Sequence, residues 1–127
     1  MTNTDSDKFA RTLAFKPLVQ RAGYAEVSAE ISPETLNGVG IAHGGFLFSL
    51  CDYASALAAN TPERLAISSG ASIDYIDPVP AGTSVVAVAS ADAENGKSGV
   101  YKVVITDSAR EKIFAVFRGR LIYKKSI

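Results

Sequence analysis

Apolar and polar residues alternate over residues 24–31, where every second side chain is apolar. Successive side chains of a strand point to opposite faces, so this segment predicts a half-buried β-strand. Asn95-Gly96 is a turn signal between residues 83–91 and 99–106, and residues 107–111 are a turn signal before residues 113–123. Turns between consecutive strands indicate an antiparallel meander. Four later segments rich in β-branched and aromatic residues predict further strands: residues 65–76, 83–91, 99–106 and 113–123.

One long stretch has a different pattern. After the tripeptide of residues 43–45, the chain runs to Asn60 without proline or glycine, which predicts a helix of about 16 residues. Its helical wheel is apolar nearly all round, and a helix of this kind is expected to be buried on every face. Near the chain start, Phe9, Leu13 and residues 17–19 predict a short amphipathic helix that stops near Pro17. The first eight residues are expected to fray.

The order strand, helix, four strands predicts an α+β fold. A curved antiparallel sheet wrapped around the one long central helix is expected, because only a concave sheet face covers so much of a helix. The length of 127 residues, without linker or repeat, predicts a single domain over residues 1–127. No apolar stretch reaches the roughly 20 residues of a membrane span, so no membrane association is expected.

Charge and cysteine content exclude several classes of function. The chain has 13 basic and 13 acidic residues and no long basic cluster, which argues against a nucleic-acid-binding protein. The single cysteine, Cys51, cannot form an internal disulfide and is predicted to be a core residue. With no leader pattern at the chain start, the expected location is cytoplasmic. One histidine and one cysteine provide no metal-ligand cluster, so no metal site is expected.

Asp52 is the main candidate for chemistry. Between Glu34 and Glu63 it is the only formally charged residue, and small and apolar residues surround it. An ionised carboxylate in such a setting is unfavourable by several kcal/mol unless partners or water compensate. Two interpretations stay open at this point. Asp52 either caps a neighbouring loop or forms an ion pair, or it acts as a general base or nucleophile in a dry cleft.

The glycines of residues 43–45 lie where the helix is expected to begin. Free amides at a helix N-terminus receive negative charge, and in an enzyme they would stabilise an oxyanion. A plain glycine turn is the alternative. Gly44 and Asp52 are eight residues apart, roughly 12 Å along a helix axis, so one reacting carbon cannot touch both. In a two-fold dimer, the helix start of one subunit can face the aspartate of the other.

His43 is the only histidine. It is either a general base or a hydrogen-bonding residue of the helix start, and the absence of a nearby acid in the sequence favours the second interpretation. A Ser-His-Asp mechanism is not expected, because the sequence contains no nucleophile-elbow motif.

The segment NGVGIAHGGFLFSLCDYASALAAN resembles the signature of the hotdog-fold acyl-CoA thioesterases of the phenylacetic-acid-degradation (PaaI) type. The resemblance is carried by Asn37, the HGG tripeptide that begins at His43, and Asp52 nine positions after that histidine. It continues through SSGASIDYIDPVPAGTSV (68–85), GKSGVYKVVITD (96–107) and VFRGR (116–120).

This resemblance implies hydrolysis of an acyl-CoA thioester at sites shared between the subunits of a homodimer, itself paired into a dimer of dimers. It implies that Asp52 is the general base or nucleophile and that the Gly44 amide of the other subunit is the oxyanion donor. Asn37 would bind the thioester oxygen or the attacking water, and Ser72 would orient that water, although the nearby Ser68 and Ser69 blur the alignment at this position. His43 would hold the Asn37 loop and the helix start.

The resemblance also implies that Lys97 and Ser98 lie near the phosphates of coenzyme A, which is part of the substrate, so no separate cofactor is expected. The implied acyl groups are (hydroxy)phenylacetyl, other aryl or medium-chain groups. Two other functions stay open: a hotdog module that binds acyl-CoA without turnover, and an acyl-thioester hydratase or dehydratase. The hydratases pair a histidine with an acid, usually within a proline-bearing loop.

Overall fold

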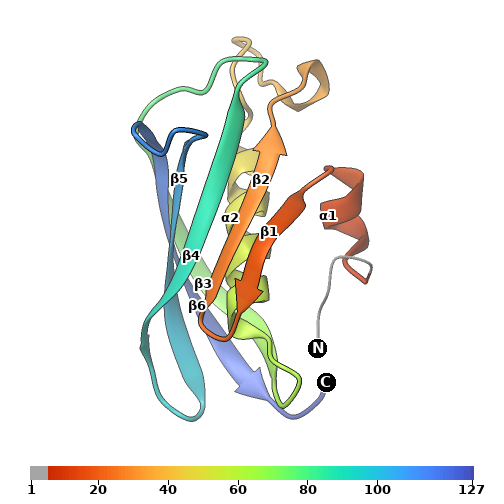
Figure 1. Ribbon diagram of the computed structural model, residues 1–127, viewed down its shortest axis with the longest axis vertical. Helices are drawn as coiled ribbons and strands as arrows, with labels where there is room; N and C mark the ends of the chain where they lie inside the picture. The colour runs from red at the N-terminus through yellow and green to blue at the C-terminus, as the bar shows by residue number, and fades with distance from the viewer. Residues whose placement is uncertain (1–5) are drawn as a thin grey trace.

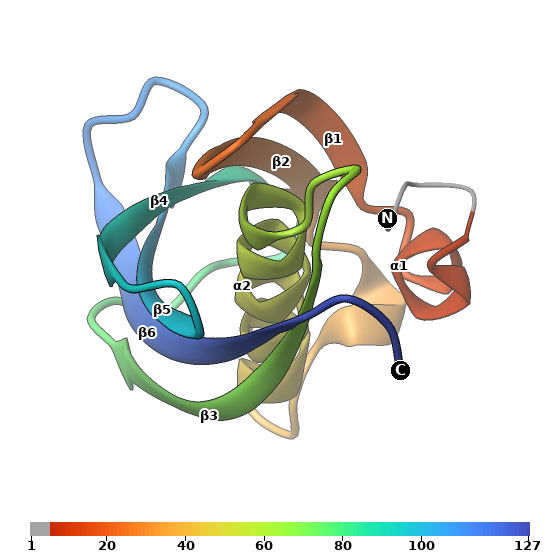
Figure 2. The ribbon, with the colours of Figure 1, turned by 90° about the horizontal axis from the view of Figure 1, so that it is seen from below.

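Six antiparallel strands form one curved sheet in the computed structural model, which describes residues 6–127 (Figure 1). The sheet wraps around the long helix α2 (Gly44–Ala59), as Figure 2 shows. This arrangement confirms the predicted α+β hotdog architecture. Across the sheet the strands are β1 (Lys16–Arg21), β2 (Tyr24–Glu30), β4 (Ser84–Glu94), β5 (Ser98–Asp107), β6 (Ile113–Lys124) and β3 (Leu65–Tyr75).

Helix α2 has the length that the sequence predicts, 16 residues. At its C-terminal end the buried Asn60 side chain satisfies backbone groups on both sides of the turn. Its Nδ2 donates to the Ala56 carbonyl at 2.8 Å, and its Oδ1 accepts from the Ala66 amide at 2.9 Å. Pro62 follows and cannot continue a helix. These bonds fix the turn that leads from α2 into β3.

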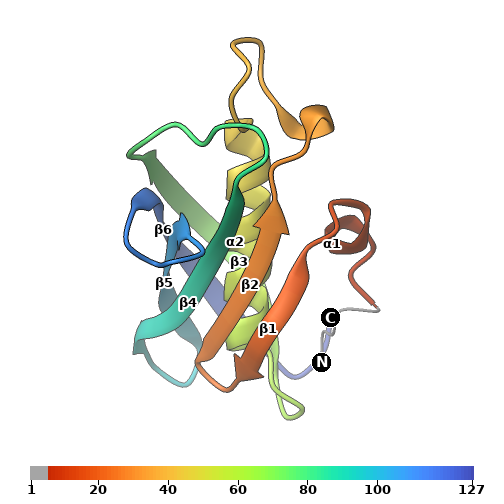
Figure 3. The same cartoon turned by 45° about the horizontal axis from the view of Figure 1, so that its top comes forward.

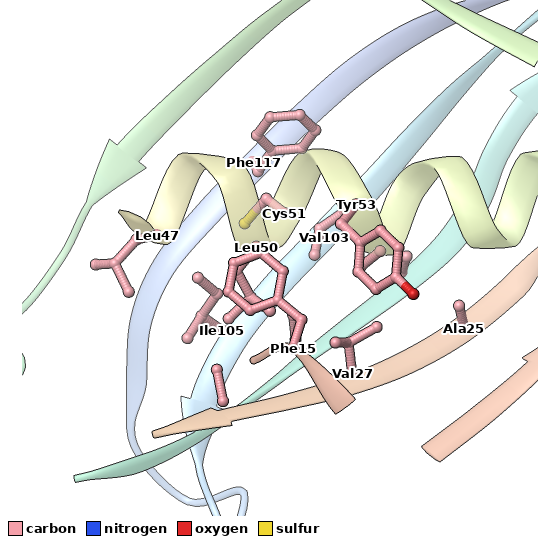
Figure 4. Close-up of a cluster of buried hydrophobic side chains, with 14 of the residues drawn as sticks. Phe15, Ala25, Val27, Leu47, Leu50, Cys51, Tyr53, Val103, Ile105 and Phe117 are labelled. Carbon is pink, nitrogen blue, oxygen red and sulfur yellow. The ribbon is translucent and has the colours of Figure 1, made fainter. Parts of the chain in front are cut away.

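The core lies between α2 and the concave face of the sheet. Leu50, Cys51 and Leu57 of α2 are fully buried there, against residues such as Val27 of β2 and Val103 of β5 (Figure 4). Burial raises the pKa of the Cys51 thiol, which therefore stays protonated at neutral pH. The prediction that Cys51 is a core residue is confirmed.

One stripe of α2 is not buried, so the expectation of burial on every face is wrong there. The stripe consists of Gly45, Phe48, Ser49, Asp52 and Ala56, and we call it the open stripe. Its members are three or four residues apart and therefore share one side of the helix. The stripe borders two pockets next to α1, and its Phe48 ring packs edge-on against Phe117 of β6. The hydropathy of the wheel could not reveal which side a single chain leaves open.

The chain before residue 22 also differs from the prediction. Helix α1 (Lys8–Thr12) is short, and the chain around Pro17 forms strand β1 instead of a helix end. β1 pairs with β2 at the edge of the sheet (Figure 3), with an irregularity after Pro17. Edge strands tolerate proline, because an outward-facing position needs no amide donor. Gly23, with φ of +82°, makes the tight turn between the two strands.

The predicted fraying of residues 1–8 concerns mainly residues 1–5, which lie outside the described residues. Asp7 and Lys8, by contrast, begin α1. The Asp7 side chain caps this helix by accepting from the Ala10 amide at 2.9 Å. No helix within residues 6–127 has the length and apolar character needed to span a membrane. A short η1 turn (Pro33–Thr35) precedes the loop that leads into α2.

Candidate active site

His43 caps the N-terminus of α2. Its Nδ1 accepts from the Gly45 amide at 2.8 Å, and its own amide donates to the Thr35 carbonyl at 2.8 Å. The ring nitrogen that accepts this bond is not available as a base. His43 therefore joins the helix start to the preceding η1 turn, in line with the hydrogen-bonding interpretation of this residue.

Asn37 organises the loop before α2. Its Oδ1 accepts from the amides of Val39 and Ile41 at 3.0 and 3.2 Å, and its own amide donates to the Ile41 carbonyl at 2.7 Å. The carboxamide oxygen is therefore used within the loop. The Nδ2 group donates to no acceptor within residues 6–127, so it is available to a carbonyl oxygen or a water molecule.

Asn37 and Gly44 line the same groove, which has a volume of about 440 Å³. Gly44 is the first residue of α2, and its amide has no acceptor among the described residues, as is usual for a first-turn amide. The groove thus receives two N–H donors and the positive end of the α2 dipole, a combination suited to an oxyanion. Its remaining walls are largely apolar: Ile41, Ala42, Leu47, Ile76, Pro78 and Val79, with Tyr75 and Asp77.

Asp52 lies in a second, smaller pocket of about 140 Å³ between α1 and α2. Its carboxylate has neither a hydrogen-bond donor nor a cation as partner in the described part of the chain. The interpretation that Asp52 caps a loop or forms an ion pair is therefore not supported within one chain. Burial raises the pKa of Asp52, and the negative charge of Asp7 in the same pocket adds to the rise. A partly buried carboxylate of raised pKa is suited to general-base chemistry.

One chain does not bring Gly44 and Asp52 together. They line different pockets, one at the start of α2 and the other beside its open stripe. This separation agrees with the distance expected from eight helical residues. Within one chain, the candidate base and the candidate oxyanion donors therefore do not face a common pocket.

The structure places Ser72 on the wrong side of the sheet for a role beside α2. Ser72 is opposite the exposed Arg118 on β6, on the face that points away from the helix. Ser68 is opposite Leu121, a core residue, and therefore faces the helix side. A bulge between Ser68 and Gly70 adds one residue and reverses the alternation. This bulge explains why the sequence could not distinguish between these serines.

Lys97 and Ser98 lie in the hairpin between β4 and β5. Both amides donate to Oδ1 of Asn95 at 2.8 Å, which makes a tight turn. Figure 1 shows this hairpin at the opposite end of the molecule from the loop between β2 and α2. One chain therefore does not bring these residues together with Asn37 and Gly44, and their role at coenzyme A stays a prediction.

Tyr75 and Asp7 border the candidate site, and no sequence pattern predicts this. Each lies far along the chain from the residue that it approaches, Gly44 and Asp52 respectively. Within residues 6–127, no group of three or more histidine, cysteine, aspartate or glutamate side chains is arranged to hold a metal ion.

Comparison with known proteins identifies the family of this chain. The sequence profile of the Thioesterase superfamily matches residues 39–114, which include Gly44, Asp52 and Ser68. The chain is also 34% identical over 116 residues to the acyl-coenzyme A thioesterase PaaI of Escherichia coli, covering 91% of this chain and 82% of that protein. The chain belongs to the Thioesterase superfamily.

Solved structures of this superfamily share the fold. The E. coli PaaI protein from the phenylacetic acid degradation operon superposes with a TM-score of 0.89 at 32% identity, covering 94% of this chain and 86% of that one. A variant of phenylacetic acid degradation protein PaaI from Thermus thermophilus superposes with a TM-score of 0.86 at 34% identity, covering 91% and 98%. The resemblance read from the Asn37, HGG and Asp52 pattern is therefore confirmed.

Proposed function

We propose that this protein hydrolyses the thioester bond of acyl-CoA to a free acid and coenzyme A. The observation that carries the proposal is Asp52, a partly buried carboxylate without a partner in the described chain and with a raised pKa. The E. coli relative, named as an acyl-coenzyme A thioesterase, supports the same reaction.

In the proposed reaction, the thioester carbonyl oxygen accepts hydrogen bonds from the Gly44 amide and from Nδ2 of Asn37. Asp52 either takes a proton from a water molecule that attacks the carbonyl carbon, or attacks that carbon itself to form an anhydride that water then opens. In the first route the C–S bond breaks and the leaving thiolate takes up the proton that Asp52 removed from water. In the second route the thiolate leaves as the anhydride forms, and it takes up a proton that is released when water opens the anhydride. Ser68 replaces Ser72 as the hydroxyl proposed to orient the water, because Ser68 faces the helix side.

The proposed catalytic unit is a homodimer in which Gly44 of one subunit faces Asp52 of the other. Three features support it: the separate pockets of Gly44 and Asp52, the open stripe of α2, and the outer edge of β3, which pairs with no strand within residues 6–127. The pairing of two dimers stays a prediction from the resemblance, as does a cytoplasmic location.

An aryl acyl group, such as (hydroxy)phenylacetyl, is the proposed substrate class. The pocket beside Asp52 has aromatic walls and a volume of about 140 Å³, which suits a ring better than a long chain; the walls include Phe9, Phe15, Phe48 and Tyr53. The hydratase alternative is less well supported, because Nδ1 of His43 already accepts the Gly45 amide. The binding module is also less well supported. An unpaired carboxylate in a partly buried pocket is energetically unfavourable, and binding without turnover does not require one.

The first test is a thiol-release assay over a panel of aryl- and medium-chain acyl-CoA esters. Wild type is expected to release coenzyme A, and Asp52→Asn and Asp52→Ala to lower kcat by about a thousandfold or more. Unchanged thermal unfolding of both variants would show that they fold. If wild type binds the esters but releases thiol no faster than the variants, the proposed function is wrong and the binding module is correct.

Subunit mixing tests the shared site. Asp52→Asn and Gly44→Val each disable one half of the proposed constellation. In a mixed dimer one of the two sites combines an intact Asp52 with an intact Gly44, so statistical mixing should restore about a quarter of wild-type activity. Mixing Asp52→Asn with Asp52→Ala is the control and should restore none. If the first mixture also restores none, although the subunits exchange, each site belongs to a single chain.

A further inference from the structure

Tyr75, the last residue of β3, contacts the first residue of α2. Its hydroxyl donates to the Gly44 carbonyl at 2.8 Å, although the two residues are 31 positions apart. About half of the Tyr75 surface is exposed, and the side chain forms part of the groove that Asn37 and Gly44 line. The Tyr75 hydroxyl therefore lies next to the proposed oxyanion site. It bonds the carbonyl of Gly44, whereas the proposed oxyanion donor is the amide of the same residue.

The peptide group between Gly44 and Gly45 is held at both ends. Its carbonyl oxygen accepts from the Tyr75 hydroxyl, and its N–H donates to Nδ1 of His43 at 2.8 Å. A peptide group is planar, so two side-chain bonds at opposite ends fix its rotation about the chain. The amide of Gly44 is separated from this plane by a single Cα atom. The direction of the Gly44 N–H therefore depends on how firmly the Gly44–Gly45 peptide plane is held.

The contact also explains the glycine at position 44. A Cβ atom there would lie 2.9 Å from the Tyr75 hydroxyl oxygen and 3.0 Å from Cζ, closer than side chains approach in proteins. Glycine is the residue with the most backbone freedom, which is unfavourable where an N–H must keep one direction. The bond from Tyr75 restricts that freedom.

We propose that Tyr75 is a positioning residue of the thioester site, which holds the first peptide group of α2 so that the Gly44 amide faces the groove. This inference rests on the proposed function, because it assigns Tyr75 to the oxyanion site of that reaction. Partial burial raises the pKa of Tyr75, with a smaller contribution from Cys51. The hydroxyl is therefore protonated at neutral pH and stays a donor.

A positioning role and a purely structural role predict different kinetics. The oxyanion develops only in the transition state, so a misdirected amide lowers kcat and kcat/KM together and leaves KM unchanged. A general loss of structure would instead lower the melting temperature, and a loss of substrate contact would raise KM.

The first experiment compares Tyr75→Phe with Tyr24→Phe. Both remove only a hydroxyl, and Tyr24 is a control because its hydroxyl bonds Glu26 on β2, on the far side of the sheet order from β3. Tyr75→Phe is expected to lower kcat by about tenfold at constant KM, less than the roughly hundredfold or more that follows complete loss of an oxyanion donor. Its melting temperature should fall no further than that of Tyr24→Phe, because each variant loses one side-chain hydrogen bond. Tyr24→Phe should leave kcat unchanged.

The second experiment is a double-mutant cycle between Gly44→Ala and Tyr75→Leu. In wild type, Gly44→Ala forces Tyr75 or the helix start to move and should lower kcat by about a hundredfold. In the Tyr75→Leu background the new methyl group has space, so the same change should lower kcat by less than about tenfold. Coupling of this sign supports the contact as the cause.

The outcomes separate this inference from the proposed function. If wild type releases no thiol, the proposed function fails, and the role of Tyr75 in it fails too. If wild type is active but Tyr75→Phe matches it in kcat, or the two changes of the cycle multiply independently, the inference alone is overturned. As a check without turnover, the ¹⁵N amide signals of Gly44 and Gly45 should shift in Tyr75→Phe and not in Tyr24→Phe.

Discussion

Two sides of helix α2 consist of similar residues but differ in what they contact. One side packs in the core, and the other leaves Asp52 partly exposed. The side toward the sheet presents Leu50, Cys51, Ala54 and Leu57, all fully buried. The open stripe presents small residues and Phe48 around Asp52, and of these Phe48 packs edge-on against Phe117 of β6 while Ser49, Asp52 and Ala56 border a pocket next to α1. The first side stabilises the fold, because it removes apolar surface from water. The second holds a carboxylate that no neighbour in the described chain neutralises, which is unfavourable for the fold alone.

The difference shows how a small domain separates stability from chemistry. Leu50 and Asp52 are two positions apart, yet one lies in the closed core and the other borders a pocket between α1 and α2. Because the open stripe carries small side chains, its loss of packing is limited. The proposed chemistry therefore lies on the part of the helix that contributes least to the core.

The largest expected effect on stability comes from the sheet side. Leu50→Ala should lower the free energy of unfolding by about 2–5 kcal/mol, because it leaves a cavity in a closed core. Ser49→Ala, its neighbour on the open stripe, removes only a bond from the Ser49 hydroxyl to the Gly45 carbonyl and should change it by less than about 1 kcal/mol. Urea unfolding of both variants measures this. Equal losses would contradict the division of the helix into two sides.

A smaller effect is expected when the charge of Asp52 is removed. The pKa of Asp52 is raised in the folded protein above its ordinary value of 3.8, so the folded state favours the protonated form. Its contribution to stability is fully present below that ordinary value and is lost as the pH rises through the raised pKa. Asp52→Asn should therefore be more stable than wild type at neutral pH, and this advantage should disappear below about pH 3.8. Urea unfolding of both proteins at several pH values measures this. An advantage of Asp52→Asn that grew as the pH fell would contradict the prediction.

The smallest effect concerns Asp7→Asn. Asparagine keeps an oxygen that caps α1 through the Ala10 amide, while the negative charge near Asp52 is lost. Burial is the larger cause of the raised pKa of Asp52, and it stays, so the pKa should fall only slightly. The acidic limb of the kcat profile should move to lower pH by the same small amount. An unmoved limb would mean that Asp7 does not act on Asp52.

Long periodic segments were predictable from the sequence, because their burial follows from local pattern. The bounds of α2 and of the five predicted strands agree closely with the structure. β1 was not predictable, since an edge strand that contains Pro17 buries little and has no clear alternation. The choice between Ser68 and Ser72 depended on a bulge at Ser69, which no period reveals.

The site was predictable only in its local part. Asn37, His43, Gly44 and Asp52 follow one another at fixed spacings along 16 residues, so a pattern identifies them. The contact between Tyr75 and Gly44 joins two distant segments, and it exists only because β3 ends beside the start of α2. Contacts of this kind depend on the complete fold and leave no mark in a local pattern.

The edge of β3 has a consequence for the newly made chain. Strand β3 is 11 residues long and pairs only with β6, so alternate residues along its outer edge present backbone donors and acceptors that no strand within residues 6–127 occupies. Such an edge can pair with any extended polypeptide of suitable register, so high local protein concentration during synthesis favours aggregation for as long as the edge is uncovered. The bulge at Ser69 and the charge of Asp74 make the β3 edge less regular and so less suited to pairing with another strand. Soluble yield should therefore depend on how soon the β3 edge is covered, and not only on the stability of the isolated fold.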